Sequence, residues 1–297
     1  MTNSKDMINP TRGNAMGTFL DGFRHRMVRT GEVKIHAVIG GDGPPLVLLH
    51  SFPQTWWEWH RLMPQLAARH TVVALDMRGA GHSDKPQGGY DKATLAADVH
   101  GVMEALGFER YAVCGHDIGA MAALALASTH RGAVTRLVVI DAPMPGWSQW
   151  EANFIDPAVW HFAFHMKRDL PERLLCGREY DYVSSFIFDR AFDHGAHATE
   201  DLEEFARSMA LPGNTRGAFE WYRAFPMDHT NARAWKREPL TIPVLALGGE
   251  HRWGPRIVAM LEEFATNVSG GSIADCGHWV PEERPTETAD AILQFLA

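Results

Sequence analysis

One aspartate of the chain stands between two glycines where an apolar run gives way to a helix-like segment. Residues 113–119 read Val-Cys-Gly-His-Asp-Ile-Gly, so that Asp117 is the centre of a G-x-D-x-G frame. Glycine on both sides allows the sharp strand-to-helix turn that lifts the central side chain above a sheet. A carboxylate there can attack an sp3 carbon and form an ester. We therefore predict that Asp117 is a covalent nucleophile, with helix capping as the alternative use of this residue.

A histidine follows the last apolar run of the chain. Residues 276–279 read Cys-Gly-His-Trp and precede a helix-like segment at the C-terminus. Hydrolysis of an ester requires an activated water, and imidazole is the side chain best matched to that task near neutral pH. The chain has 16 histidines, so position rather than residue type selects His278 as the base. The alternative is a loop imidazole that only forms hydrogen bonds.

Two acidic residues could orient this histidine, because each follows an apolar run. Asp141 comes directly after residues 137–140, whereas Glu250 is separated from its run by two glycines. Either side chain could instead cap a helix or face solvent in a loop. We favour Asp141 on its position at the immediate end of a run, and Glu250 remains the second candidate.

The segment His-Ser-Phe-Pro at residues 50–53 ends another apolar run. In the strand-to-helix arrangement predicted above, such a loop supplies one backbone N–H of an oxyanion hole, and the residue after the nucleophile supplies the other. The donors would be the N–H groups of Phe52 and Ile118. The alternative is a plain turn that Pro53 ends. An oxyanion donor of this kind contributes roughly 3 to 4 kcal/mol to stabilisation of the transition state in acyl chemistry.

Short apolar runs alternate with segments of helical spacing along most of the chain. The runs expected to be strands are residues 23–28, 33–39, 46–49, 71–75, 111–114, 137–140, 244–247 and 271–274. The expected helices include residues 56–67, 95–106, a segment from 118 onward and 285–296. This alternation predicts an α/β protein with a mainly parallel sheet that helices cover on both faces. The carboxyl ends of such strands meet at one edge, which would bring the candidate residues together.

The alternation stops between residue 143 and about residue 239, where Trp, Phe, His and Met are frequent and no short apolar strand occurs. This segment is expected to form a helical cap inserted between two core strands. The predicted division is a core of residues 1–144 and 238–297 and a cap of residues 145–237.

The composition limits the class of partner. A formal net charge of −8 and a pI near 6.0 give no basic surface for nucleic acid or for an anionic membrane. We expect a small-molecule substrate and no metal, since the three cysteines are widely spaced without a C-x-x-C pair. We also expect no cofactor, because Gly79-Ala80-Gly81 lacks the third glycine of a dinucleotide loop and the chain has no Walker pattern. Residues 1–21 lack an apolar leader core, and no apolar run has the length of a membrane span, so we expect a cytoplasmic protein. The sequence is compatible with a homodimer.

These motifs together resemble those of the epoxide hydrolases of the α/β-hydrolase superfamily, from about residue 23 to residue 297. Residues 50–59, His-Ser-Phe-Pro-Gln-Thr-Trp-Trp-Glu-Trp, are similar to the HGFP-Q-x-W stretch of that family, with Ser51 in place of glycine. Residues 76–86 resemble its D-x-R-G-x-G-x-S loop, and residues 115–119 its nucleophile motif. The resemblance implies an α/β-hydrolase fold with an eight-stranded, mostly parallel sheet. It also implies that an epoxide is opened to a vicinal diol through an ester on Asp117.

In this family two cap residues, commonly tyrosines, hold and protonate the epoxide oxygen. Residues 220–223, Glu-Trp-Tyr-Arg, resemble the segment that carries the second tyrosine, which implies Tyr222. The first position falls in residues 159–162, which implies His161. This His/Tyr pair resembles the subgroup of the cystic-fibrosis-channel inhibitory factor and implies Asp141 as the orienting acid. Without the resemblance, both would be unremarkable aromatic residues of the cap. The pocket walls expected from it are His50, Pro53, Trp160, Phe162 and Trp279.

Haloacid dehalogenases of the fluoroacetate type share this frame but carry Arg directly after the nucleophile and again three residues later. Here these positions are Ile118 and Met121, which cannot pair with a substrate carboxylate. Phe162 stands where those enzymes would have a halide-holding Trp. Haloalkane dehalogenases usually have Trp after the nucleophile, so Ile118 also disfavours them. A non-catalytic receptor on the same fold is a remote alternative, since it would not need the complete set of catalytic residues.

Overall fold

The computed structural model describes residues 20–154 and 156–297 of the chain. Within them, eight strands form one sheet in the order β1-β2-β4-β3-β5-β6-β7-β8. β1 pairs with β2 and β2 with β4 in antiparallel fashion, and the other neighbours are parallel, which confirms the predicted sheet. Residues 1–19, most of the segment expected to lack a leader, lie outside the described residues. The strands are β1 (Phe23–Thr30), β2 (Val33–Gly40), β3 (Pro45–Leu49), β4 (Thr71–Leu75), β5 (Tyr111–His116), β6 (Val134–Ile140), β7 (Val244–Gly249) and β8 (Val268–Ile273).

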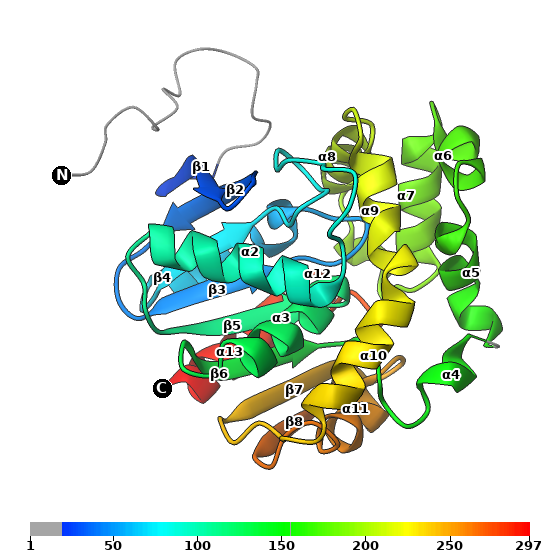
Figure 1. Cartoon of the computed structure of the whole chain (residues 1–297). Helices are drawn as coiled ribbons and strands as arrows, with labels where there is room; N and C mark the ends of the chain where they lie inside the picture. The colour runs from blue at the N-terminus through cyan, green and yellow to red at the C-terminus, as the bar shows by residue number, and fades with distance from the viewer. Residues whose placement is uncertain (1–19, 155) are drawn as a thin grey trace.

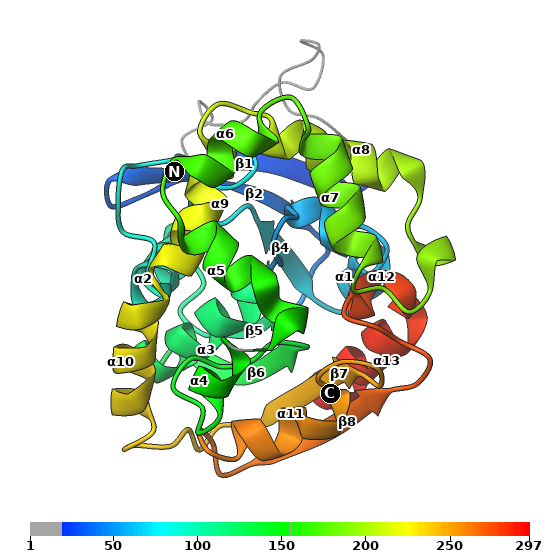
Figure 2. The same ribbon diagram turned by 90° about the vertical axis from the view of Figure 1, so that its right-hand side faces the viewer.

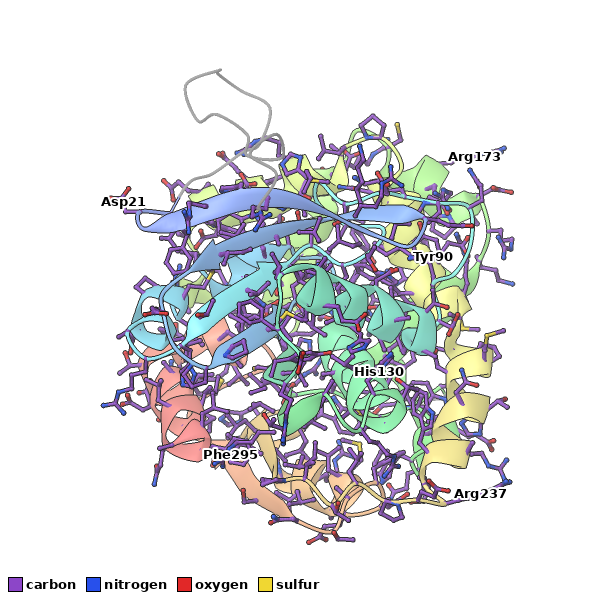
Figure 3. All side chains as sticks on the ribbon, turned by 60° about the vertical axis from the view of Figure 1, so that its left-hand side comes forward. Asp21, Tyr90, His130, Arg173, Arg237 and Phe295 are labelled. Carbon is purple, nitrogen blue, oxygen red and sulfur yellow. The ribbon has the colours of Figure 1, made fainter. Side chains whose placement is uncertain are left out.

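The sheet separates two apolar layers, because successive side chains of a strand point to opposite faces. In β3, Val47 and Leu49 join the layer formed with α2, α3 and α11, whereas Leu46 and Leu48 join the layer formed with α1 and α13. Helices therefore cover both faces, as predicted (Figure 1), and side chains fill the space between them and the sheet (Figure 3). The core helices are η1 (Trp56–Trp59), α1 (Met63–Ala67), α2 (Lys92–Ala105), α3 (Ile118–Thr129), α11 (Gly254–Leu261), α12 (Val280–Glu283) and α13 (Pro285–Leu296).

Two elements differ from the sequence prediction. The prediction of a single helix over residues 56–67 is wrong. The 3-10 helix η1 ends at Trp59, and α1 begins at Met63 after a turn. Pro64 has no N–H to bond the carbonyl of His60, so one continuous helix cannot pass through it. The last strand, β8, begins at residue 268 rather than 271. Its Ser-Gly-Gly-Ser centre carries no apolar signal, and β8 lies at the edge of the sheet.

Between β6 and β7, the described residues form helices and no strand. They are α4 (Trp150–Asn153), η2 (Pro157–Val159), α5 (Trp160–Met166), α6 (Leu170–Leu175), α7 (Glu179–Phe188), η3 (His194–Ala196), α8 (Thr199–Met209), α9 (Asn214–Arg223) and α10 (Phe225–Trp235). Figure 2 looks onto this group, with α5 in front of the sheet edge where the parallel strands end. All of these helices fall within residues 145–237, and the domain boundaries themselves stay a prediction. Across the described part of the chain, no helix combines the length and the apolar character that a membrane span requires.

A buried ion pair joins these helices to the core. Lys92, the first residue of α2, lies 2.8 Å from Asp228 of α10, and both side chains are almost completely buried. The Lys92 ammonium also donates to the Trp221 carbonyl at 2.8 Å, and the Lys92 N–H donates to the second Asp228 oxygen at 2.7 Å. On its other side, Trp221 Nε1 donates to the Arg78 carbonyl at 2.9 Å. The end of α9 is thus held by the first residue of α2 and by the loop that contains Arg78.

We expect Lys92→Met to lower the free energy of unfolding by about 3 to 5 kcal/mol, because it leaves the Asp228 carboxylate buried without a counter-charge. Urea unfolding followed by circular dichroism measures the change. Lys92→Met with Asp228→Leu should recover part of the loss, since the double variant buries no lone charge. Arg207→Met, which removes an exposed pair with Glu204, is the control and should change stability by less than about 1 kcal/mol. Wild-type stability in the single variant would contradict this account of the pair.

Candidate active site

Asp117 occupies a sharp turn between β5 and α3. Its backbone angles, φ 48° and ψ −116°, lie in a region that is costly for a residue with a Cβ atom. The flanking glycines permit the close approach of α3: a Cβ on Gly115 would lie 2.2 Å from the Gly119 carbonyl oxygen, and one on Gly119 would lie 2.1 Å from the Leu49 carbonyl oxygen. The Asp117 side chain forms no capping hydrogen bond with α3. The frame therefore presents the carboxylate beyond the end of β5.

One of the two N–H groups predicted as oxyanion donors contacts this carboxylate. The Phe52 N–H donates to Asp117 Oδ2 at 3.3 Å, and Ile118, the other predicted donor, is the first residue of α3. Burial raises the pKa of Asp117, whereas His116, the backbone N–H groups of Phe52 and Ile118 and the charge of Arg190 act in the opposite direction. With Oδ2 held by the Phe52 amide, the other oxygen is left to form a bond.

His278 lies against Asp141 and not against Glu250. The His278 Nδ1 atom is 2.6 Å from Asp141 Oδ2. Asp141 Oδ1 accepts the N–H groups of Gly249 at 2.9 Å and of Trp253 at 3.1 Å, which fixes the plane of the carboxyl group. Glu250 is exposed and accepts a backbone N–H of the loop after β8. The geometry therefore favours the first of the two acids proposed from the sequence.

The surroundings of His278 and Asp141 favour a neutral His278 ring with a lone pair on Nε2. Burial lowers the pKa of His278, and the charges of His116, Arg252 and Arg190 act in the same direction. Burial raises the pKa of Asp141. With its proton on Nδ1 and facing the acid, the neutral imidazole can accept a proton at Nε2. This is the state that a general base requires.

Glu58 and His116 form a buried network behind the nucleophile that the sequence analysis missed. Glu58 Oε2 accepts the Ser51 N–H at 2.7 Å, and Oε1 lies 2.6 Å from His116 Nδ1. His116 Nε2 lies 2.9 Å from the His278 carbonyl oxygen. The network joins the loop of residues 50–53, the turn at Asp117 and the loop that contains His278. A lone acid within Trp-Trp-Glu-Trp was the available signal, since a charge among aromatic residues is rarely buried without a partner.

The cap places His161 of α5 and Tyr222 of α9 next to each other. Their ring centroids are 5.8 Å apart at an angle of 82°, and both side chains are buried. Burial raises the pKa of the Tyr222 hydroxyl, and the charge of Asp117 raises it further. Within the described residues, the Tyr222 hydroxyl has no hydrogen-bond partner. Arg190, another residue that the sequence analysis missed, contacts the His161 ring.

The residues predicted to line the pocket divide into three groups. Trp279 and Phe162 are buried beside the site, with the Trp279 ring 4.7 Å from that of His278 and the Phe162 ring 5.7 Å from that of Tyr222. Pro53 is buried in the oxyanion loop. The other two lie elsewhere: His50 uses both ring nitrogens to hold its own loop and the end of β4, and Trp160 is 47% exposed at the surface of the cap.

One group of side chains in the described residues has the geometry of metal ligands. Ligand atoms of Glu250, His251 and Asp275 lie within 4.8 Å of one another, and all three residues are exposed. Exposed acidic groups commonly occur together without an ion, and the His251 ring stacks on Phe192 at 4.1 Å. Asp193, which precedes η3, accepts hydrogen bonds from the Gly195 N–H and from Arg284.

Comparison with known proteins identifies relatives along almost the entire chain. Residues 44–162 match the α/β hydrolase fold family. A soluble epoxide hydrolase of Corynebacterium sp. (strain C12) is 37% identical over 279 residues, which cover 92% of this chain and 97% of the relative. A fluoroacetate dehalogenase of Burkholderia sp. is 33% identical over 298 residues, which cover 93% and 95%.

The solved structures agree with this placement. The crystal structure of wild-type Cfl2 from Burkholderia cenocepacia superposes with a TM-score of 0.90 at 35% identity and covers 95% of this chain and 98% of that one. Identity of this size over nearly full length, with a TM-score of 0.90, shows a shared fold. The chain therefore belongs to the α/β-hydrolase fold family, in the group that contains the soluble epoxide hydrolases.

Proposed function

We propose that this protein is an epoxide hydrolase that forms an ester on Asp117 and hydrolyses it with water activated by His278. The observation that carries the proposal is the pairing of the buried Tyr222 and His161 rings in the cap, where the charge of Asp117 acts on the Tyr222 hydroxyl. When an epoxide ring opens, the leaving oxygen stays bonded to the substrate and must gain a proton. Neutral hydrogen-bond donors such as Tyr222 and His161 suit this requirement. The identity to the soluble epoxide hydrolase of Corynebacterium supports the same reaction.

In the first step, the free oxygen of the Asp117 carboxylate attacks an epoxide carbon while Oδ2 stays on the Phe52 N–H. The carbon–oxygen bond of the ring breaks, and its electron pair moves to the epoxide oxygen. Tyr222 donates its hydroxyl proton to that oxygen, and His161 stabilises it by a hydrogen bond. An unassisted alkoxide is a poor leaving group, so these donors lower the barrier to ring opening.

In the second step, Nε2 of His278 takes a proton from a water molecule, whose oxygen attacks the carbonyl carbon of the ester. Asp141 stabilises the imidazolium that forms. The charge that develops on the carbonyl oxygen is held by the N–H groups of Phe52 and Ile118. Collapse of this intermediate breaks the bond between the carboxyl carbon and the alkyl oxygen, and the released diol takes a proton from His278. The second proton of the water, left on the new carboxyl group, returns to the Tyr222 phenolate through solvent. Asp117 is then again a carboxylate, one oxygen of which comes from water.

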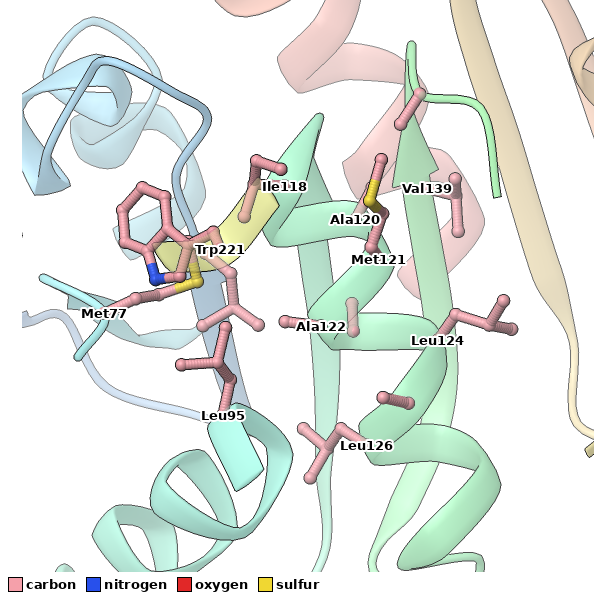
Figure 4. Close-up of a cluster of buried hydrophobic side chains, with 14 of the residues drawn as sticks. Met77, Leu95, Ile118, Ala120, Met121, Ala122, Leu124, Leu126, Val139 and Trp221 are labelled. Atoms are coloured by element: carbon pink, nitrogen blue, oxygen red, sulfur yellow. The ribbon is translucent and has the colours of Figure 1, made fainter. Parts of the chain in front are cut away.

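Dehalogenation is the second candidate reaction, because a fluoroacetate dehalogenase is also a relative. Ile118 and Met121 argue against it. Both side chains are buried in the apolar cluster around α3 (Figure 4), where they cannot pair with a substrate carboxylate. A non-catalytic receptor would not require the Asp141–His278 contact of 2.6 Å.

We also propose that the protein acts in the cytoplasm, on a small uncharged substrate and without a cofactor. Cys176 is exposed and free, which suits a reducing compartment, where thiols stay reduced. The helical cap of residues 145–237 and the core of residues 1–144 and 238–297 are its proposed domains. A homodimer is compatible with this arrangement.

Asp117→Asn is expected to abolish formation of diol from styrene oxide and from an aliphatic epoxide, because the amide cannot form the ester. The variant should unfold at close to the wild-type temperature, since the substitution is nearly isosteric. Asp290→Asn, at an exposed position of α13, is the control and should keep full activity. Fluoroacetate and a haloalkane should be tested in the same assays as the two epoxides. Release of fluoride or halide by a wild-type enzyme that leaves the epoxides unchanged would establish dehalogenation instead.

His278→Gln is expected to stop the reaction after the first step, so that an adduct of enzyme and epoxide accumulates. Mass spectrometry of the intact protein should show an increase equal to the mass of the substrate, located on the peptide of Asp117. In a single turnover of the wild type in heavy-oxygen water, the label should enter Asp117 and not the diol. Label in the first diol, with no adduct in the variant, would show that Asp117 acts as a base toward water.

Tyr222→Phe and His161→Phe are each expected to slow the formation of the adduct, by about 10²- to 10⁴-fold where general acid catalysis is lost. The rate is best measured in the His278→Gln background by rapid mixing and mass spectrometry, because hydrolysis of the ester is then blocked. Phe164→Leu, in a partly buried position on the same helix as His161, controls for repacking of the cap. Adduct formation at the wild-type rate in both Phe variants would rule out the proposed donors.

A further inference from the structure

A buried arginine contacts one of the two proposed donors in the cap. Arg190 follows α7, and only 4% of its surface is exposed. Its NH2 group lies 2.8 Å from Nδ1 of His161, and its NH1 group donates to the Phe186 carbonyl at 3.0 Å. The guanidinium also lies 3.8 Å from the centroid of the Phe186 ring. Its one carboxylate partner in the described structure is Asp189, which is 59% exposed at the side chain.

The donor chemistry of arginine decides the protonation state of His161. A guanidinium group carries only N–H donors and stays charged in proteins. The Nδ1 atom of His161 must therefore accept, which requires a lone pair on Nδ1 and leaves the ring proton on Nε2. Burial lowers the pKa of His161, and the charges of Arg190, His165 and Arg252 lower it further, so the ring stays neutral.

We propose that Arg190 is a positioning residue that holds His161 in the neutral tautomer with its proton on Nε2, directed to the epoxide oxygen. This inference rests on the proposed function. A neutral imidazole can donate a hydrogen bond to a developing oxyanion when its surroundings prevent protonation. The contact with a cation at Nδ1 makes the N–H at Nε2 more acidic, and the donor therefore becomes stronger as negative charge develops on the substrate.

The backbone of the same residue contacts the loop of the base. The Arg190 carbonyl accepts the N–H of His278 at 3.0 Å. The side chain of Arg190 thus orients the cap donor, and its backbone positions the base of the second step. Burial of the Arg190 guanidinium is unfavourable by itself, because its carboxylate partner Asp189 is largely exposed. Its contacts with both catalytic candidates explain why the charge is nevertheless buried.

The tautomer is measured directly by nitrogen-15 NMR of protein labelled at histidine, with the His161 resonances assigned by their loss in His161→Phe. In the wild type, Nδ1 should show the shift of an unprotonated nitrogen and Nε2 that of a protonated one. In Arg190→Met the two tautomers should both be populated. Arg190→Lys, which retains a cationic donor, should restore most of the wild-type pattern, and Asp189→Asn, which retains Arg190, should leave it unchanged. A wild-type ring with its proton on Nδ1 overturns the proposal without any variant.

Kinetics in the His278→Gln background then separate this role from a general effect of charge. Arg190→Met should slow adduct formation by about 10- to 100-fold, the range usual when the partner that orients an active histidine is removed. In a His161→Phe background the same substitution should have no further effect, because Arg190 acts through His161. Additive losses, or no loss in Arg190→Met, overturn the inference. Absence of any adduct in the parent enzyme would instead overturn the proposed function, and the tautomer would still be decided by NMR.

Discussion

The carboxyl group of Glu58 is the point at which the loops of the site are joined, because its two oxygens contact the Ser51 N–H and the His116 ring. Burial raises the pKa of Glu58 and lowers that of His116, which favours a neutral pair in which the acid donates to Nδ1. The other ring nitrogen then donates to the His278 carbonyl, and every polar atom of the network has a partner. A carboxylate at Glu58 would repel the charge of Asp117. The neutral network avoids that repulsion and still orders the oxyanion loop.

The ends of two adjacent strands carry the strain of the site. Asp117 and Asp141 both have positive φ, at 48° and 39°, which costs on the order of 1 to 3 kcal/mol for each residue. Sheet hydrogen bonds continue into both turns: the Asp117 N–H donates to the Ile140 carbonyl at 3.1 Å, and the Asp141 N–H donates to the Leu247 carbonyl at 2.8 Å. The turns at Asp117 and Asp141 are thus built by the sheet, whereas the cap residues His161 and Trp221 are held by the contacts of His161 with Arg190 and of Trp221 with the Arg78 carbonyl.

Local sequence signals predicted the residues at strand ends, because apolar runs, flanking glycines and chain position locate Asp117 and His278 without knowledge of distant contacts. The choice between Asp141 and Glu250 needed the hydrogen bonds from Gly249 and Trp253, which join separate loops. Arg190 and His116 were missed for the same reason, since their partners lie far along the chain. Trp160 was expected in the pocket wall from resemblance alone, and a resemblance does not show which face of a short helix is buried.

The whole cap is inserted into one crossover connection. β6 and β7 are parallel neighbours in the sheet, and such neighbours need a connection of only about a dozen residues. The register between them is set by backbone pairing and by the apolar layers, not by the length or sequence of what joins them. An ancestral gene could therefore lengthen, recombine or replace this connection while the nucleophile and base stayed functional. New leaving groups become accessible by evolution of a single insertion, whereas new nucleophilic chemistry requires changes in the sheet itself.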